Sequence, residues 1–280
     1  MPLSSYLVLA CRQLAPFSAT ARTDVEVLAM HVTRLDRAGL VAHGNDELDA
    51  GQVLQLDALV RRRAAGEPVA YLTGHREFWS MDLQVTPDTL IPRPETELLV
   101  ELALARIPPA ADWSIADLGT GTGAVALAIA RERPGCRVVA TDVSAAALAV
   151  ARENARILGV RQVAFREGNW LEALEAGQFS LIVSNPPYVR DSDPHLDCTD
   201  LRFEPHLALH AGRDGLDAIR EIAGGAQECL RPGGWLLLEH GYDQSEAVSE
   251  ILAGSGYSDC LSGRDLAGHF RVSGGRRPAA

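Results

Sequence analysis

The segment SIADLGTGTGAVALAIARERPGCRVVATD, residues 114–142, is the most informative part of the chain about its fold. Its apolar opening, 114–118, is typical of a short buried strand, and the glycine-rich turn after it leads into a helical segment, 123–133. A second apolar run, 137–142, predicts another strand, which ends in an acid. A strand, a helix and a further strand in succession predict two parallel strands joined by a right-handed crossover.

The same alternation continues toward the carboxyl end. The pattern predicts, in order, a helix over 144–158, strands over 162–168 and 179–185, a long helix ending near Leu230, a strand over 235–241, another helix and two tail segments. Strands and helices that take turns in this way favour an α/β fold with a doubly wound, Rossmann-like sheet. Such sheets bind their ligands outside the carboxyl ends of the strands.

Residues 1–73 have a different, helical periodicity. The spacing of Thr23 and Glu26 predicts a capping box at the start of one helix. A second helix is predicted from Asp46 to just before Gly66. We interpret the three arginines at 61–63 as the solvent-exposed basic last turn of this second helix.

A β-hairpin connector is predicted between the helical part and the alternating part. Residues 78–91 are spaced as in extended chain, with a turn at Pro87 and Asp88, and Pro94 is well placed as the first residue of the next helix. The sequence therefore predicts three parts: a helical domain over 1–73, a connector over 74–91 and the α/β domain over 92–280.

Composition excludes several classes of function. The 280 residues include 37 acids and 26 bases, every base is Arg, and the formal net charge is −11. The lack of Lys excludes Schiff-base and P-loop lysine chemistry, and an acidic total argues against sequence-blind binding to nucleic acid. The five Cys are scattered without paired spacing, so neither a metal site nor a disulfide framework is predicted. No apolar stretch reaches the ~18 residues of a membrane span, and we expect a cytoplasmic protein with no membrane partner.

The glycine-rich turn and the acid after it are typical of a cofactor site. Glycines at 119, 121 and 123 remove side chains where a ligand must touch backbone, and the N–H groups of the next helix point into the gap. Asp142 ends the following strand, where a carboxylate can bind both hydroxyls of an adenosine ribose. A purely structural interpretation makes the turn a tight connection and Asp142 a helix cap, although Ser144 is the better placed cap. The pattern indicates an adenosine-containing cofactor and leaves both NAD and S-adenosylmethionine open.

The motif NPPY, residues 185–188, favours the second cofactor. It follows the strand at 179–184, beside the glycine-rich turn, and its two prolines fix the backbone. The Asn185 side chain and the Pro186 carbonyl are then a rigid pair of acceptors that suits a planar NH2 group. With both N–H groups held, the nitrogen lone pair is directed toward a methyl donor. Tyr188 is expected to lie against the substrate or near a sulfonium.

A wider set of motifs carries a resemblance to a known family. Beside NPPY the chain contains YLTGHREFW (71–79), TLIPRPETE (89–97), RFEPHLAL (202–209), GRDGLD (212–217), LLLEHGYDQ (236–244) and RDLAGHFRV (264–272). This set resembles the PrmC/HemK family, the protein-(glutamine-N5) methyltransferases that act on class I peptide-chain release factors, and it covers nearly the whole chain.

The resemblance implies an S-adenosylmethionine-dependent enzyme that methylates the glutamine of the GGQ loop of those release factors. It implies that the cofactor is bound by Gly119, Thr120, Gly121, Thr122, Gly123, Asp142, Trp170 and Asn185. It further implies that Asn185, Pro186, Pro187 and Tyr188 bind the substrate, with Asn185, Pro186 and Tyr188 catalytic, and that no metal takes part. Asn169 stands where the family frequently has an acid, and an amide can still accept a hydrogen bond from adenine. Arg93 and Glu95 are candidates for closing over the pocket, although a helix start explains Glu95 equally well.

Two other functions remain open from the residues alone. An adenine-N6 methyltransferase acting on DNA or RNA also needs NPPY, but residues 1–80 carry 8 Arg and 9 acids, and the remainder 18 Arg and 28 acids, so neither part offers a basic platform. A non-catalytic adaptor could keep the fold and bind a partner through residues 1–73. The intact NPPY and glycine-rich turn argue against it. We expect the helical domain to help select a protein substrate, with no direct binding of nucleic acid.

Overall fold

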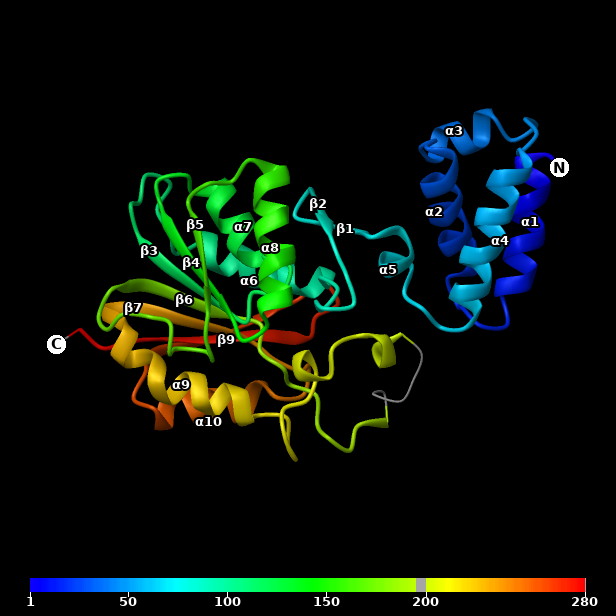
Figure 1. Ribbon diagram of the computed structural model, residues 1–280. Helices are drawn as coiled ribbons and strands as arrows, with labels where there is room; N and C mark the ends of the chain where they lie inside the picture. The colour runs from blue at the N-terminus through cyan, green and yellow to red at the C-terminus, as the bar shows by residue number, and fades with distance from the viewer. Residues whose placement is uncertain (195–199, 280) are drawn as a thin grey trace. The chain divides into compact units, whose positions relative to one another are not determined.

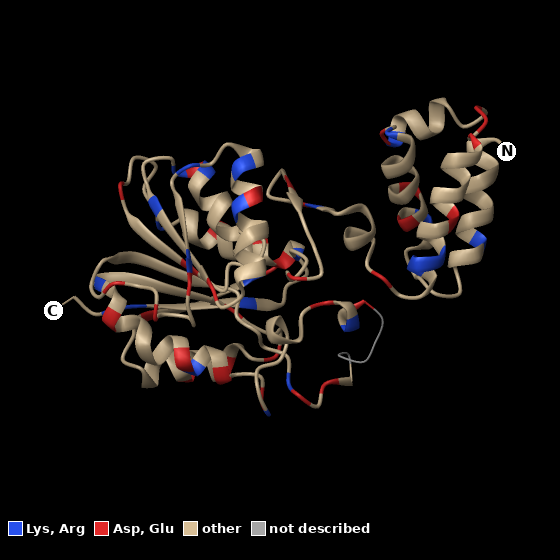
Figure 2. Cartoon of the chain, viewed as in Figure 1, with Lys and Arg blue, Asp and Glu red and all other residues tan. Residues whose placement is uncertain are grey.

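A computed structural model describes residues 1–194 and 200–279 of the chain (Figure 1). None of the helices in these residues combines the length and the apolar character that crossing a bilayer requires. Arginine positions are interspersed with acidic ones along both the helical and the α/β parts (Figure 2).

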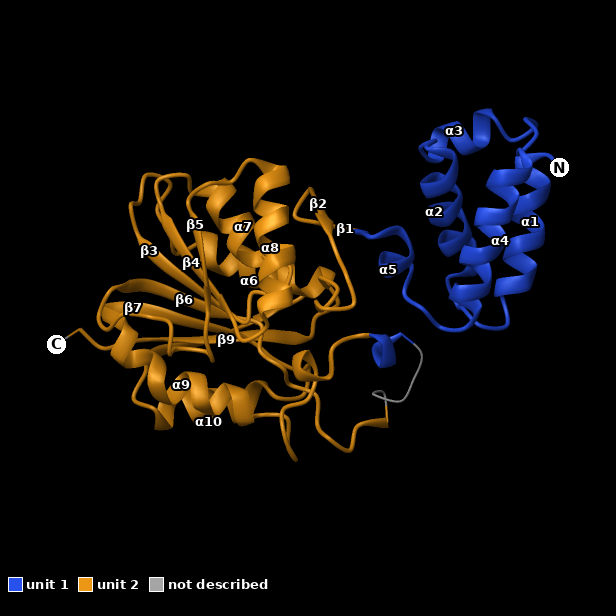
Figure 3. Ribbon diagram, viewed as in Figure 1, with its two compact units in different colours: residues 1–75, 195–203 blue, residues 76–194, 204–280 orange. Residues whose placement is uncertain are grey.

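The chain forms two compact units (Figure 3). The first comprises Met1–His75 and, of the described residues further on, 200–203. The second comprises Arg76–Pro194 and 204–279. The division after His75 falls within the predicted connector, two residues beyond the expected end of the helical domain.

The first unit is built from helices. They are α1 (Leu3–Leu14), α2 (Ala21–Thr33), α3 (Arg37–Ala42), α4 (Ala50–Ala64) and α5 (Val69–Thr73). Their apolar faces form one core that includes Leu14, Leu28 and Leu56. Helix α4 starts with a capping box between Asp49 and Gln52, close to the predicted start.

Two expectations for this unit were wrong. Helix α2 begins at Ala21, so Thr23 lies inside the helix and caps nothing. The physical reason is a more favourable arrangement upstream, where the Ser18 and Thr20 hydroxyls donate to the Asp24 carboxylate at 2.8 and 2.9 Å. The arginine run is not wholly solvated either, because Arg63 is buried and its guanidinium pairs with the Asp24 carboxylate at 2.7 Å.

The connector folds as a hairpin. Strands β1 (His75–Phe78) and β2 (Met81–Gln84) form a two-stranded sheet. Trp79 and Ser80 make the turn with φ angles of +51° and +53°, as a two-residue hairpin turn requires. The strand pattern ends at Gln84, earlier than the expected 91. A 3-10 turn, η1 (Pro94–Thr96), then opens α6 (Glu97–Leu104), which confirms Pro94 as a helix start.

The second unit holds a seven-stranded sheet, which confirms the doubly wound fold. Its strands are β3 (Ser114–Leu118), β4 (Arg137–Asp142), β5 (Val163–Glu167), β6 (Phe179–Ser184), β7 (Leu230–Glu239), β8 (Ser258–Arg264) and β9 (Phe270–Arg276). They lie in the order β5-β4-β3-β6-β7-β9-β8. The first five are parallel, and β9 pairs antiparallel with both β7 and β8.

Helices cover both faces of this sheet (Figure 1). Helices α6, α7 (Ala124–Glu132) and α8 (Ala145–Leu158) lie on one face, and α9 (Asp217–Cys229) and α10 (Ser245–Gly254) lie on the other. Each face has its own apolar core, centred on Leu127 and Ile129 on one side and on Ile219 and Ile222 on the other. The strand order reverses between β3 and β6, and such a reversal opens a crevice at the carboxyl ends of the strands.

Candidate active site

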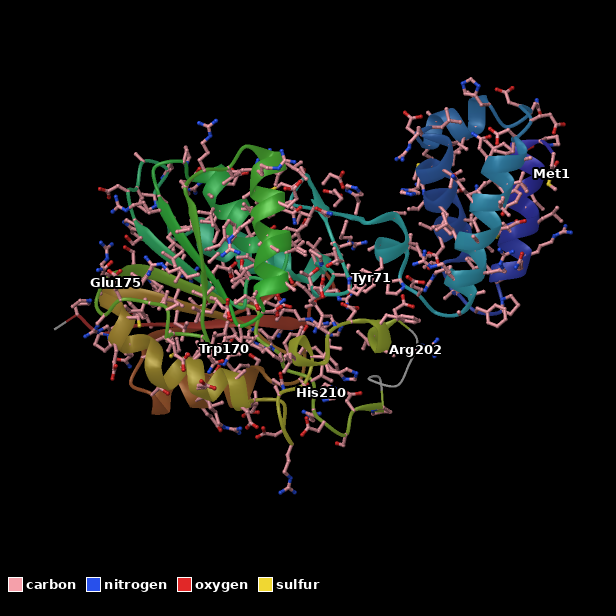
Figure 4. The ribbon with its side chains drawn as sticks, viewed as in Figure 1. Met1, Tyr71, Trp170, Glu175, Arg202 and His210 are labelled. Carbon is pink, nitrogen blue, oxygen red and sulfur yellow. The ribbon has the colours of Figure 1, made fainter. Side chains whose placement is uncertain are left out.

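A cavity of about 550 Å³ lies at this reversal point. Its lining residues come from the four segments that follow β3, β4, β5 and β6, and from the described stretches 88–96 and 205–221. Figure 4 labels Trp170 and His210, which are two of them. The volume falls within the range of small-molecule and cofactor sites.

The glycine-rich turn forms the floor of the cavity between β3 and α7. Gly119, Gly121 and Gly123 have φ angles of +67°, +53° and +84°, which side-chain-bearing residues rarely adopt. The turn is fixed from beneath by Asp117, whose Oδ2 accepts from the Thr120 hydroxyl at 2.6 Å and from the Ala126 N–H at 3.2 Å. Burial raises the pKa of Asp117 to about 7, and these two hydrogen bonds oppose the rise.

Trp170 packs against this turn. A Cβ added to Gly119 would lie 3.1 Å from Cζ3 of the indole, a contact tight enough that the ring would have to shift. Trp170 itself has a φ of +45°, and its carbonyl accepts from the Thr141 hydroxyl at 3.3 Å. Beside it, the Asn169 Nδ2 donates to Glu221 Oε1 at 3.1 Å. All four of Gly119, Asn169, Trp170 and Glu221 line the cavity.

Asp142 connects the ends of two strands. One carboxylate oxygen accepts from the Gly121 N–H and the other from the Ser144 N–H, both at 2.9 Å. Burial raises the pKa of Asp142, and the two hydrogen bonds lower it. Ser144 caps α8 by accepting from the Ala147 N–H, as expected, and Asp142 also has a structural role, which the alternative interpretation of the sequence had allowed.

The NPPY segment forms the opposite wall, across the reversal from the glycine-rich turn. Among the described residues that line the cavity are Asn185 and Pro187, but not Pro186 or Tyr188. Gln244 holds the segment by donating to the Tyr188 carbonyl at 3.1 Å. The next residue, Val189, exchanges two backbone hydrogen bonds with the stretch 209–211.

The Asn185 and Tyr188 side chains point toward a shared polar cluster. Asn185 Nδ2 donates to the Thr96 hydroxyl at 3.1 Å, and the Tyr188 hydroxyl donates to Glu239 Oε1 at 3.4 Å. Glu239 is fully buried, which raises its pKa to about 7. Burial and the neighbouring Glu239 raise the pKa of Tyr188 well above its usual range. Tyr188 thus directs its hydroxyl to Glu239, and the expectation that its ring lies against the substrate or near a sulfonium stays a prediction.

Arg93 and Glu204 link two stretches beside the cavity. The Arg93 guanidinium pairs with the Glu204 carboxylate, and the other oxygen of that carboxylate accepts from the Ile91 N–H at 3.0 Å. The Glu204 side chain is completely buried. Sequence reasoning singled out Arg93, but it missed Glu204, Thr96 and Glu239. For Glu239 the sequence did contain a signal, because this acid ends the apolar strand WLLLE. Burying a carboxyl group there costs free energy unless another polar group pairs with it.

Comparison with known proteins agrees with the arrangement. Residues 6–74 match the PrmC N-terminal domain, and residues 95–202 match the methyltransferase small domain. A release factor glutamine methyltransferase of Xylella fastidiosa (strain Temecula1) is 54% identical over 257 residues, covering 92% of this chain and 94% of that protein. Its namesake from Escherichia coli (strain K12) is 48% identical over 259 residues, covering 92% and 93%. A solved methyltransferase from Pyrococcus furiosus shares the fold, with a TM-score of 0.54, 19% identity, and coverage of 79% of this chain and 98% of that one.

Proposed function

The chain belongs to the family of release factor glutamine methyltransferases, and on that premise we propose that it transfers a methyl group from S-adenosylmethionine to the side-chain amide nitrogen of the glutamine in the GGQ loop of class I release factors. One observation carries the proposal. The glycine-rich turn with Asp142 and the NPPY residues Asn185 and Pro187 line the same cavity. A cofactor site and an acceptor of a planar amide therefore lie within reach of one another.

The cavity residues fit S-adenosylmethionine. Gly119 and Gly121 line the cavity without side chains, and the Asp142 carboxylate, which accepts from the Gly121 and Ser144 N–H groups, keeps lone pairs for further donors. Asp142 would accept from the ribose hydroxyls, and Trp170 and Asn169 would border the adenine. When bound, the cofactor supplies an electrophilic methyl group on a sulfonium.

The chain's own contribution to the reaction is position. An amide nitrogen is a poor nucleophile because its lone pair is delocalised, and we propose that Asn185 Oδ1 and the Pro186 carbonyl each accept one of its N–H groups. The lone pair would then be directed toward the methyl group of a bound cofactor, and such alignment can lower the barrier by ~7 kcal/mol or more. Transfer would form the new bond to nitrogen as the bond from the methyl group to sulfur breaks, and the sulfur would leave as a neutral thioether. The proton leaves the nitrogen afterwards, so no residue is assigned as a general base.

Asn185→Ala is the variant that tests this role. It should bind the cofactor as the wild type does. Its turnover should be slower because the activation barrier rises by about 3 kcal/mol, as when one transition-state hydrogen-bond partner is deleted. Calorimetry with S-adenosylmethionine and a methyl-transfer assay measure the two quantities. Undiminished turnover would remove Asn185 from the role.

Labelled methyl separates the proposal from its rivals. The protein is incubated with labelled S-adenosylmethionine and, in turn, with a release factor, with a release factor whose GGQ glutamine is replaced by Ala, and with DNA and RNA. We expect label on the unaltered release factor and on none of the other substrates. Label on nucleic acid but not on the release factor would make the protein a nucleic-acid methyltransferase. Failure to bind the cofactor at all would favour an adaptor.

A further inference from the structure

Asn185 has an amide whose two ends are similar in size but opposite in chemistry. Its carbonyl oxygen accepts a hydrogen bond, whereas its NH2 group donates. Only the oxygen can hold the N–H of a substrate amide. An enzyme that relies on Asn185 therefore needs something that decides which end of this side chain meets the substrate.

Thr96 is in contact with the NH2 end. Its hydroxyl accepts from Asn185 Nδ2 at 3.1 Å. A hydroxyl has a single proton to donate. The direction of the Thr96 proton therefore decides whether the oxygen or the NH2 group of Asn185 faces Thr96. If the Thr96 proton pointed at Asn185, the amide oxygen would turn toward Thr96 and the NH2 group toward the cavity.

Glu239 gives the Thr96 proton another destination. The Thr96 hydroxyl is near enough to the buried Glu239 carboxyl to lower the pKa of that carboxyl by hydrogen bonding, as does the Tyr188 hydroxyl, which donates to Oε1 at 3.4 Å. A carboxyl group keeps acceptor lone pairs in both of its charge states, and Glu239 Oε2 has no hydrogen-bond partner among the described atoms, so the group has more lone pairs than donors. With its proton directed to Glu239, the Thr96 oxygen can only accept from Asn185.

We infer that Thr96 and Glu239 are positioning residues, which hold the Asn185 amide with its oxygen toward the substrate. The inference rests on the proposed function, because it is there that Asn185 binds the substrate amide. The chain of donors runs in one direction, from Asn185 to Thr96 and from Thr96 to Glu239. Turning the amide around would set its oxygen against the Thr96 oxygen with no proton between them.

Thr96→Val and Thr96→Ser form the matched test. Valine keeps the shape of threonine but has no hydroxyl, so the amide is free to turn, and turnover should fall roughly tenfold, the size of one net hydrogen bond. Serine keeps the hydroxyl and should restore turnover. Affinity for S-adenosylmethionine, measured by calorimetry, should stay unchanged in both, and turnover is assayed well below the melting temperature of each variant. Thr33→Val, which removes a hydroxyl bonded to the Ala29 carbonyl on α2, controls for the substitution itself.

A double-variant cycle tests the connection to Glu239. Glu239→Leu removes the acceptor and should lower turnover like Thr96→Val, while the double variant should be no slower than either single one, because all three break the same chain. The inference would be overturned if the loss of turnover in the double variant were the product of the losses in the two single variants. Equal losses of turnover in Thr96→Val and Thr96→Ser would overturn it as well. Asn185→Ala is assayed alongside. Loss in Asn185→Ala without loss in Thr96→Val rejects the positioning role alone, whereas full activity of Asn185→Ala rejects the proposed function.

Discussion

The Asp142 carboxylate accepts hydrogen bonds from backbone N–H groups of two different turns, at Gly121 and Ser144. It lines the cavity beside the glycine-rich turn. Asp142→Ala should therefore weaken binding of S-adenosylmethionine, by about 1–3 kcal/mol for the loss of hydrogen bonds to a charged group. Asp142→Asn, which keeps one acceptor oxygen, should lose less. Titration calorimetry measures both, and an unchanged affinity in Asp142→Ala would place the residue outside the cofactor site.

Glu239 predicts a dependence of stability on pH. Its pKa rises from the usual 4.5 to about 7 because burial disfavours the charged form. Arg271 and the hydroxyls of Thr96 and Tyr188 oppose the rise, and Glu95 adds to it. A carboxyl with a raised pKa stabilises the fold below its unfolded pKa and loses that contribution as pH rises through the folded pKa.

Glu239→Gln has an amide of the same shape that does not titrate. The unfolding free energy of the wild type, relative to this variant, should therefore fall by about 3 kcal/mol between pH 4.5 and pH 7. Urea unfolding of both proteins at a series of pH values measures the difference. A flat or rising difference over this range would contradict the raised pKa.

At the scale of elements, one buried ion pair joins α2 to α4. The side chains of Arg63 and Asp24 are only 9% and 8% exposed. Arg63→Met keeps most of the stem but leaves the carboxylate without its charge partner, and it should lower the free energy of unfolding by about 3 kcal/mol. Arg61→Met removes an exposed charge from the same turn and should change little. Chemical denaturation of the two variants makes the comparison, and equal effects would show that the pair is not stabilising.

Much of the fold could be predicted because its signals are local. Strands 114–118 and 137–142 and the helix capped by Ser144 have the predicted bounds, since each is a continuous apolar or periodic run between clear breakers. The order of the strands could not be predicted. An alternating run looks the same whether it pairs parallel or antiparallel, so the two tail segments gave no sign that β9 inserts between β7 and β8.

The candidate site likewise has a part that the sequence predicted and a part that it did not. The glycine-rich turn, Asp142 and NPPY are contiguous motifs, and the structure brings them to one cavity. Thr96, Glu204 and Glu239 come from three distant segments, and no spacing in the sequence connects them. Tyr188 shows the limit of a motif: the sequence gives its neighbours along the chain, but the partner of its hydroxyl lies on β7.

At the scale of the whole molecule, the cavity belongs to one unit. None of the described residues that line it comes from residues 1–75, which we propose help to select the protein substrate. The net charge of −11, with arginines interspersed among acids (Figure 2), agrees with a protein substrate better than with nucleic acid.

The proposed activity is tested by peptide mass spectrometry of a class I release factor after incubation with this protein and S-adenosylmethionine. We expect a single added methyl group on the side-chain amide of the GGQ glutamine, present with the wild type and strongly reduced with Asn185→Ala. A release factor without that methyl group, or one methylated at another residue, would contradict it.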